Sequence, residues 1–459
     1  MEKPFQSFFW AGCGALLLAL VSCTPRQSET RDERLKWNLA TLQGDYESQG
    51  HRNPKWDKDA VEALKNFAGI RVQPEDNLET RADLVGYSAE SAVNAGCDDP
   101  LIKYLYCRYA PGSSAKTLSQ RQDEFRLIAK DMEKSGYSPV RKFYANVSAA
   151  EWLWARRNTN LWPEVRQFRS VALEDLGQAL QDKTLPGEEA YQACDAFFQM
   201  VGRNDRELTN AYVTIQKLLF NNRPKWATAY LIKADYYLLY AWHGRGNGNA
   251  DQVTEEGWRL FRERLAESEQ ALNRAWALDP KNARTPVLMI QVAEGQQKKR
   301  PEMESWFQRA MNLDPNNYEA CRGKLHYLYP QWYGSREDML AFGRECVAST
   351  NWGGHVPLIL VDAHSELVGS LSAANRDAYW ELPDVWPDIK AAYEKFSQAN
   401  PNATRFRYPY AAYAFRCGQW QDFNEQIALL RKTGDDLNVS YFGGREAFDK
   451  MVGIAGQQK

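Results

Sequence analysis

The residues of this chain that could recognise a ligand are tryptophans in segments rich in glycine, proline and acidic side chains. An indole face beside polar groups suits a peptide or a sugar. Such tryptophans occur at five places: Trp242, Trp332, Trp352, Trp380 and Trp386. We take Trp242, Trp332 and Trp386, together with Arg245, as candidate partner-binding residues. The alternative is that large rings only wedge helix pairs together, and it is favoured for Trp332, whose loop must turn a tight corner.

The histidines and the glycine-rich run predict neither a metal nor a cofactor. The histidines are His51, His243, His326, His355 and His364, and none stands in the spacing that zinc sites use. The run at 243–249 follows no predicted strand and lacks a phosphate-binding sequence, so a nucleotide site is not expected.

The sequence offers no catalytic centre. A Gly-x-Ser-x-Gly nucleophile elbow is absent, and nothing resembles the separate catalytic domain of lytic transglycosylases. Two carboxylates from distant positions could still meet, so a cell-wall or glycan-acting hydrolase is the enzymatic alternative left open. We expect the protein not to be an enzyme.

Two cysteines, Cys321 and Cys346, could be joined by a disulfide. If their predicted helices are antiparallel and joined near Trp332, both cysteines lie at a similar height above the turn. Cys97 and Cys107 are excluded as a pair, because one helix would hold them more than about 10 Å apart. Buried free thiols are favoured over a disulfide.

The N-terminal residues place a charge and an apolar stretch ahead of a cysteine. Lys3 precedes apolar residues 8–21, and Leu20-Val21-Ser22-Cys23 follows. This resembles a bacterial lipobox, in which the chain is cut before the cysteine and that cysteine is lipidated. A membrane helix is the weaker alternative, because a span needs about 20 apolar residues. We expect residues 1–22 to be a signal peptide and Cys23 to be the lipid anchor.

The residue after the cysteine bears on location. By resemblance to lipoproteins of bacteria with two membranes, Thr24 in place of Asp favours the outer membrane. We expect the periplasmic face rather than the cell surface. Net charge is −2 with no long run of one sign, so a large basic surface for nucleic acid is not expected.

Beyond residue 56 the apolar positions keep a helical rhythm of three or four residues, broken at glycine and proline. Asp99-Pro100 and Ser138-Pro139 predict helix starts, since each is a cap followed by proline. Ser335 with Asp338 approximates a capping box. No alternating strand pattern occurs. The chain is predicted to be all-α, with a polar tether at 23–55, N-terminal helical repeats at 56–222 and a C-terminal helical region at 223–459.

One helix ending occurs twice. Leu278-Asp279-Pro280-Lys281-Asn282 returns as Leu313-Asp314-Pro315-Asn316-Asn317, an offset of 35 residues (313 − 278). With Leu272 and Ala275 before the first and Phe307 and Ala310 before the second, these endings resemble tetratricopeptide repeats, whose period is about 34 residues. The sequence departs from that pattern at Ile290-Gln291, where a Leu-Gly pair is expected. The predicted fold is therefore a tetratricopeptide-like but irregular helical-repeat solenoid.

A second resemblance covers about residues 225–425. Its motifs are Tyr329-Pro330-x-Trp332-x-Gly334-Ser335, Trp242-x-Gly244-Arg245-Gly246 and Val253-Thr254-x-Glu256-Gly257-Trp258. They look like an uncharacterised bacterial lipoprotein family of helical-repeat proteins, a domain of unknown function. The resemblance implies the fold but no activity.

These patterns lead to two functional hypotheses. The first is a lipid-anchored, non-catalytic periplasmic module that binds a protein or peptide partner, because stacked helix pairs expose broad curved faces. The alternative is a surface-exposed glycan- or nutrient-binding lipoprotein of an uptake system, which the tryptophan content suits.

Overall fold

The computed structural model describes residues 29–72, 78–110, 116–202, 204–246, 248, 250–432 and 437–457. Within these ranges the chain is helical and contains no β-strand, which confirms the predicted all-α helical-repeat class. None of the described helices combines the length and the apolar character needed to cross a bilayer. The predicted signal peptide and Cys23 lie outside the described residues.

The polar tether predicted for residues 23–55 is wrong from residue 31 onwards. Helix α1 (Arg31–Leu39) runs through one π-helical turn (Ala40–Gly44) into α2 (Asp45–Gln49). Thr30 and Glu33 form a capping box at its start. Leu42 and Tyr46 are fully buried, and so is the polar Asn38. The segment is polar in composition, but the buried Asn38 side chain donates a hydrogen bond to Glu189, far along the chain.

Three more helices complete an N-terminal group: α3 (Asp57–Val72), α4 (Leu78–Asn94) and α5 (Pro100–Tyr109). The predicted start at Asp99 is confirmed, since its Oδ1 accepts hydrogen bonds from the backbone N–H of Leu101 and Ile102. Its other oxygen accepts from the Tyr137 hydroxyl at 2.8 Å, which ties the cap to the next part of the chain.

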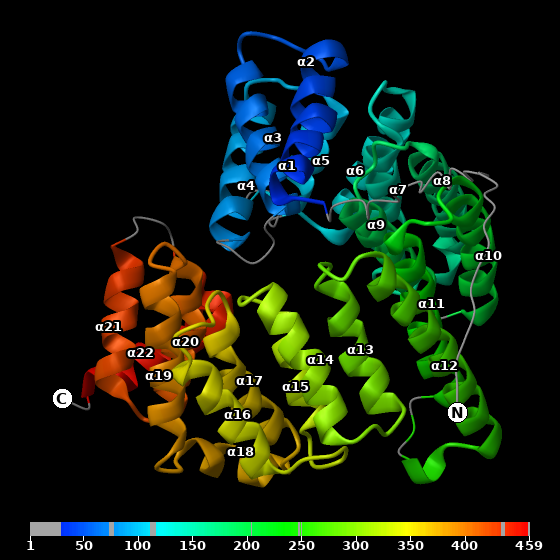
Figure 1. The fold of residues 1–459 in the computed structure, drawn as a ribbon. Coiled ribbons are helices and arrows are strands. Elements are labelled where there is room, and N and C mark those ends of the chain that lie inside the picture. The colour runs from blue at the N-terminus through cyan, green and yellow to red at the C-terminus, as the bar shows by residue number, and fades with distance from the viewer. Residues whose placement is uncertain are drawn as a thin grey trace, which may run out of the picture.

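The following helices form an array of antiparallel neighbours that curves through the molecule (Figure 1). They are α6 (Leu118–Lys134), α7 (Pro139–Trp154), α8 (Trp162–Gln181), α9 (Gly187–Val201), α10 (Asp205–Asn222), α11 (Ala227–Arg245), α12 (Glu255–Leu278), α13 (Arg284–Gly295), α14 (Arg300–Leu313), α15 (Tyr318–Tyr327), α16 (Arg336–Ala348), α17 (Ile359–Gly369), α18 (Ala373–Trp380), α19 (Val385–Ala399), α20 (Arg407–Arg416), α21 (Trp420–Arg431) and α22 (Arg445–Gln457). From α7 to α19 each odd-numbered helix contacts the next odd one, so these helices form one continuous layer.

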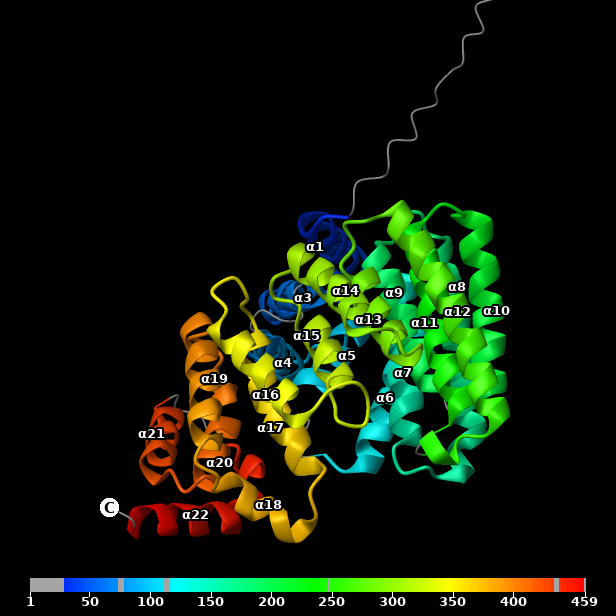
Figure 2. The ribbon, with the colours of Figure 1, turned by 60° about the horizontal axis from the view of Figure 1, so that its bottom comes forward.

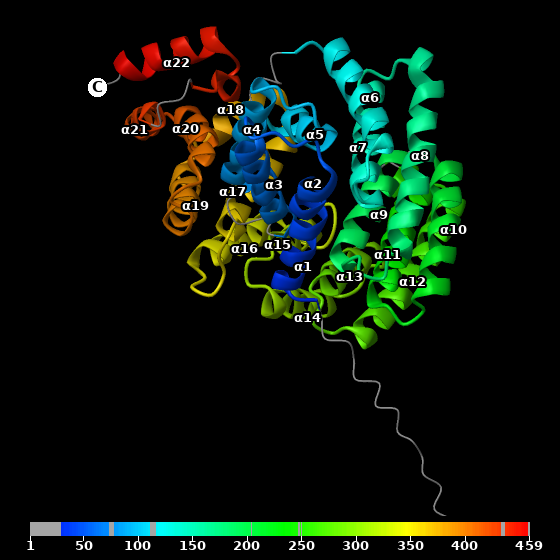
Figure 3. The same cartoon turned by 90° about the horizontal axis from the view of Figure 1, so that it is seen from above.

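The two ends of the array meet through the N-terminal group. Figure 3 shows α1–α5 between the C-terminal helices and the arm made of α6–α12. Helix α4 contacts the short turn Thr404–Phe406, where Arg405 lies 3.5 Å from Asp83. The first five helices therefore close the curved array into a ring.

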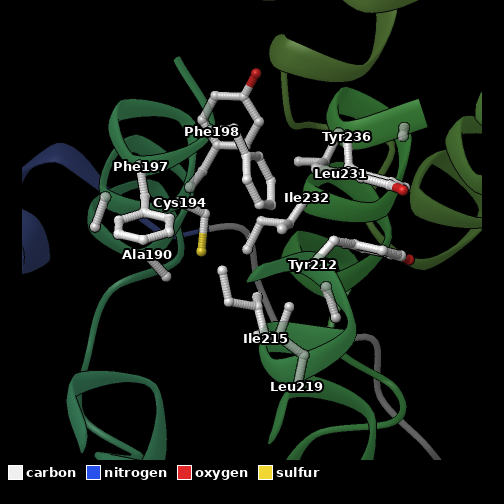
Figure 4. Packing of buried hydrophobic residues seen from close by; sticks show 14 of the residues in the cluster. Ala190, Cys194, Phe197, Phe198, Tyr212, Ile215, Leu219, Leu231, Ile232 and Tyr236 are labelled. Carbon is white, nitrogen blue, oxygen red and sulfur yellow. The ribbon is translucent and has the colours of Figure 1, made fainter. Parts of the chain in front are cut away.

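Buried aromatic residues hold the layers together. Figure 4 shows Cys194, Phe197 and Phe198 of α9 facing side chains of α10 and α11. The rings of Tyr212 and Tyr236 stack with centroids 3.8 Å apart. Such stacking and burial of large apolar surface is the main stabilising contribution in a repeat array.

The two Leu-Asp-Pro endings have the same local structure. Asp279 and Asp314 end α12 and α14, and each carboxylate accepts a hydrogen bond from the backbone N–H two residues on. Asn282 and Asn317, again 35 residues apart, then accept from the N–H groups that open the next helix. The predicted joint is confirmed.

Gln291, which stands where tetratricopeptide repeats carry glycine, does not separate the helices. Its side chain is exposed, whereas Ile290 beside it is fully buried. Close approach is provided by Gly295 instead, where an added Cβ would lie 2.7 Å from Leu265 and 3.0 Å from Phe261 of α12. The close approach of α13 to α12 therefore occurs at Gly295, four residues after Gln291.

Candidate functional site

A groove with a volume of about 1680 Å³ runs along one edge of the array. Four consecutive connections line it, at residues 183–186, 223–226, 279–283 and 314–317, and each follows an even-numbered helix. Helix α1 forms the opposite wall; Figure 2 shows it beside the ends of α9, α13 and α14. We call this feature the joint groove.

A proline stands in each connection that lines the joint groove. The four connections contain Pro186, Pro224, Pro280 and Pro315. Pro224, Pro280 and Pro315 directly follow the C-cap of a helix, which they cannot continue because proline lacks an N–H. Pro186 is the N-cap of α9. The groove therefore follows from the repeat itself, with one proline-containing turn for every helix pair.

Helix α1 and Glu29, which precedes it, are attached to the opposite wall of the joint groove by hydrogen bonds. The Trp37 indole N–H donates to Thr184 Oγ1 at 3.3 Å. The Glu29 carboxylate accepts from the backbone N–H of Gly187 at 3.2 Å and of Glu188 at 3.4 Å. These N–H groups belong to the first turn of α9, where a negative charge is favourable. The start of the described chain is thus held against the groove.

Arg284 lies at the centre of the charged lining. It pairs with Glu188 and with Glu319, each at 2.7 Å, and its guanidinium lies 4.8 Å from the centre of the Tyr191 ring. Burial acts to raise the pKa of Glu188, but Arg284, Arg34 and a hydrogen bond from Gln192 together hold that pKa below the ordinary value of glutamate. Three lysines along the rim (Lys183, Lys225, Lys281) are exposed.

Two carboxyl groups close to Arg284 are outside the lining. Burial, with Asp195 adding to it, raises the pKa of Asp235 to about 7, and the pKa of Asp195 is also raised by burial. Asp235 stands on α11 and Asp195 on α9. They are forty residues apart (235 − 195), so the sequence did not indicate that they lie close together. Neither residue lines the joint groove.

Three of the four predicted partner-binding residues come together elsewhere. Trp242 and Trp332 meet edge to face with ring centres 6.0 Å apart, and Arg245 lies within 6 Å of both and of Trp258. We call this group the aromatic corner. It joins the α11–α12 connection to the α15–α16 connection, at the edge opposite the joint groove.

Arg245 fills the aromatic corner. It lies 5.6 Å from the Trp242 ring centre, 5.2 Å from Trp258 and 5.9 Å from Trp332. It also donates hydrogen bonds to the carbonyl oxygens of Gly246 and Gly248. The guanidinium thus already occupies the place between the rings that a ligand would need. Trp258 was not predicted, although it stands in the Val253–Trp258 motif.

The fourth residue, Trp386, lies apart from the other three. It belongs to α19 and stacks on Tyr410 of α20, with ring centres 5.8 Å apart and planes inclined by 17°. It packs against the buried clusters on both sides. Its position is that of a wedge between two helices.

The buried histidine His364 has a partner on each ring nitrogen. Its Nδ1 lies 2.8 Å from the Tyr379 hydroxyl and its Nε2 3.2 Å from Asp388. Burial acts to raise the pKa of Asp388, but His364 and Arg344 hold it below the ordinary value. Among the described residues no group of three His, Cys, Asp or Glu side chains is placed to hold a metal ion.

Cys321 and Cys346 lie side by side, as antiparallel helices require, but both are free thiols. Burial, followed by a hydrogen bond with Cys321, raises the pKa of Cys346. Cys321 also contacts the sulfur of Met311 at 3.7 Å. The structure therefore shows the predicted proximity without the disulfide.

Fold and groove together define an all-α helical-repeat protein. Comparison with protein-family models and with curated proteins gave no match.

Proposed function

We propose that this protein is a lipid-anchored, non-catalytic binding module of the bacterial outer membrane, and that an extended polypeptide segment of a partner binds in the joint groove. The observation that carries the proposal is the groove itself. It is built from four successive repeat connections, so its length follows the array.

The size of the groove favours a peptide over a small molecule. Small-molecule sites usually enclose about 300–1,000 Å³, and the joint groove measures about 1680 Å³. Neighbouring helices lie about 8–10 Å apart, so the four helices that follow the connections (α9, α11, α13 and α15) span roughly 25–30 Å. This is about the length of an eight- or nine-residue extended segment.

The lining suits a polypeptide as well. Asn282 and Asn316 offer amide groups, Leu313 is an apolar side chain with 37% exposure, and lysines stand along the rim. Among the described residues that line the groove there is no histidine, cysteine or serine. This composition supports binding more than nucleophilic chemistry.

The glycan-binding alternative has weaker support. Sugars stack on open indole faces, and here arginines lie over those faces. Arg223 lies 4.3 Å from the Trp226 ring centre in the joint groove, and Arg245 lies among the three indoles of the aromatic corner. No feature of the joint groove or of the aromatic corner supports a cell-wall or glycan-acting hydrolase.

Panning a random peptide library displayed on phage against the purified mature protein tests the binding proposal. Enriched peptides should bind at least about tenfold more weakly to Leu313→Glu, a loss of about 1.4 kcal/mol. Leu382→Glu is the matched control, because Leu382 has 40% exposure but lies outside the groove. Equal binding by both variants, or no enriched peptide, would contradict the proposal.

The anchor has its own test. Cys23→Ala should leave the protein unprocessed or free of the membrane fraction, and a variant that fractionates as the processed wild-type protein does would show the lipobox interpretation to be wrong. Quenching of tryptophan fluorescence by oligosaccharides, lost in Trp332→Ala or Trp386→Ala, would favour the glycan alternative.

A further inference from the structure

The distance between the expected lipid anchor and the folded protein is much shorter than the sequence suggested. The predicted tether covered residues 23–55, but the chain is already held at Glu29, whose carboxylate caps α9. Glu29 stands only six residue steps beyond Cys23 (29 − 23). A fully extended chain spans at most about 3.6 Å per residue, so these six reach about 20 Å.

Glu29 is also one of the residues that line the joint groove. A lipid attached at Cys23 therefore brings this edge of the array within about 20 Å of the bilayer. The opposite edge lies a helix length away. Helix α11 has 19 residues and begins at the groove, so its far end lies about 28 Å beyond that edge.

We propose that the joint edge of the array faces the surface of the lipid bilayer, with the groove opening toward the headgroups and the aromatic corner pointing away. This inference rests on the proposed lipid anchor at Cys23. In this orientation the joint groove opens toward the lipid headgroups. The peptide that binds in it would belong to a membrane-embedded partner, which holds the segment close to the bilayer surface.

Charge along this edge agrees with a lipid neighbour. Lys183, Lys225 and Lys281 stand on three successive connections and are exposed. A lysine is attracted to an anionic bilayer, and this attraction falls off within a Debye length of about 10 Å. The tether leaves enough space for one extended segment between edge and headgroups, since strands lie about 5 Å apart and sheets about 10 Å.

The test measures which edge is close to lipid. Native cysteines in the described chain are buried, so a fluorescent maleimide can be attached selectively to Lys225→Cys at the joint edge. The matched control is Gln331→Cys, an exposed residue in the connection at the aromatic corner. Lipidated protein is reconstituted in phosphatidylethanolamine–phosphatidylglycerol vesicles that contain a nitroxide-headgroup lipid.

Quenching should be several-fold stronger at residue 225 than at residue 331, and a Gly-Ser spacer inserted after Ser28 should remove the difference. Equal quenching of both positions, or stronger quenching at 331, in protein that floats with the vesicles would overturn the orientation while leaving the anchor intact. If lipidated wild-type protein and Cys23→Ala float equally, the anchor proposal itself fails. The two failures are thereby distinguished.

Discussion

Arg71 and Glu189, 118 residues apart in the chain, form a buried ion pair in which Nη2 and Nε of the arginine lie 2.6 Å and 3.1 Å from one carboxylate oxygen. Asn38 of α1 donates to the other oxygen at 3.0 Å, and Arg141 donates to the Asn38 side chain at 2.8 Å. This network joins α1 and α3 to α7 and α9. It positions the wall of the joint groove.

Removal of the carboxylate should loosen this junction. Glu189→Ala leaves Arg71 buried without its counter-ion, and breaking a buried pair in this way costs about 3–5 kcal/mol. We expect a matching fall in the free energy of unfolding, measured by urea titration with circular dichroism. Glu256→Ala is the control, because Glu256 forms an exposed pair with Arg259, and it should change nothing measurable.

A double variant sharpens the same experiment. Arg71→Met combined with Glu189→Met removes both partners of the pair, so it should be more stable than Glu189→Met alone, which leaves Arg71 beside the buried Arg141 without a carboxylate. A double variant that is less stable than both single ones would show that the pair itself, and not the unpaired charge, determines the stability of the junction.

Gly295 should be intolerant of the smallest side chain. An alanine Cβ would meet Leu265 at 2.7 Å and Phe261 at 3.0 Å, and both are buried. Overpacking of this kind costs about 1–3 kcal/mol. In contrast, Gly453 of α22 has nothing within 4 Å, so Gly453→Ala should raise stability by about 0.5–1 kcal/mol. Thermal unfolding of both variants tests the opposite signs, and equal signs would contradict the packing account.

Helix boundaries were predictable where they depend on neighbouring residues. The sequence indicated helix starts at Asp99-Pro100 and Ser138-Pro139, and the structure has helices that begin at Pro100 and at Pro139. In each case the signal is a cap residue directly followed by proline. The Leu-Asp-Pro joints were predictable for the same reason, since their hydrogen bonds reach only two or three residues along the chain.

Contacts between distant segments were not predictable from the sequence. The polar segment that contains Asn38 was interpreted as a tether, because its partner Glu189 lies 151 residues away. The joint groove was missed for the same reason, since α1 forms one wall and four later connections form the other. The sequence predicted the two Leu-Asp-Pro helix endings, but it did not show that they lie at the same edge of the array as residue 29.

Stability should depend on pH through Asp175. Burial, with Glu133 adding to it, raises the pKa of Asp175 to about 7, above an ordinary value of about 3.9. The folded protein then binds more protons than the unfolded chain between about pH 4 and 7, so the free energy of unfolding falls as pH rises through that window. Its contribution is full below about pH 4 and is lost above pH 7.

Asp175→Asn should reduce this dependence and leave the part carried by Asp235, whose pKa burial also raises to about 7; it should stabilise the protein at pH 8 on the order of a few kcal/mol. The melting temperature measured from pH 4 to 8 checks the slope. Asp377→Asn, at an exposed position of α18, should leave the slope unchanged. A slope that is unchanged in Asp175→Asn would show that Asp175 does not contribute to it.

Cys321 and Cys346 should form a disulfide when the protein is oxidised. Their thiols are close enough for Cys321 to raise the pKa of Cys346, and the two positions are 25 apart in the chain (346 − 321). Closing a loop of this length stabilises a protein by about 3–4 kcal/mol in the chain-entropy account. Mass spectrometry of unreduced peptides after mild oxidation should find this pair linked, and Cys346→Ser should lose the gain in melting temperature. Linkage of Cys97 to Cys107 instead would contradict the prediction.

Trp332 should matter for stability and leave binding in the joint groove unchanged. Its ring packs against Trp242 at 6.0 Å and lies 5.9 Å from Arg245, at the edge opposite the groove. Trp332→Ala removes a half-buried indole from this corner and should cost about 2–3 kcal/mol, near the lower end for large-to-small substitutions. Trp332→Phe, which keeps a ring in place, should cost less. Peptide affinity should be the same for all three proteins under conditions where each is folded. A loss of affinity at full stability would move the binding site to the aromatic corner.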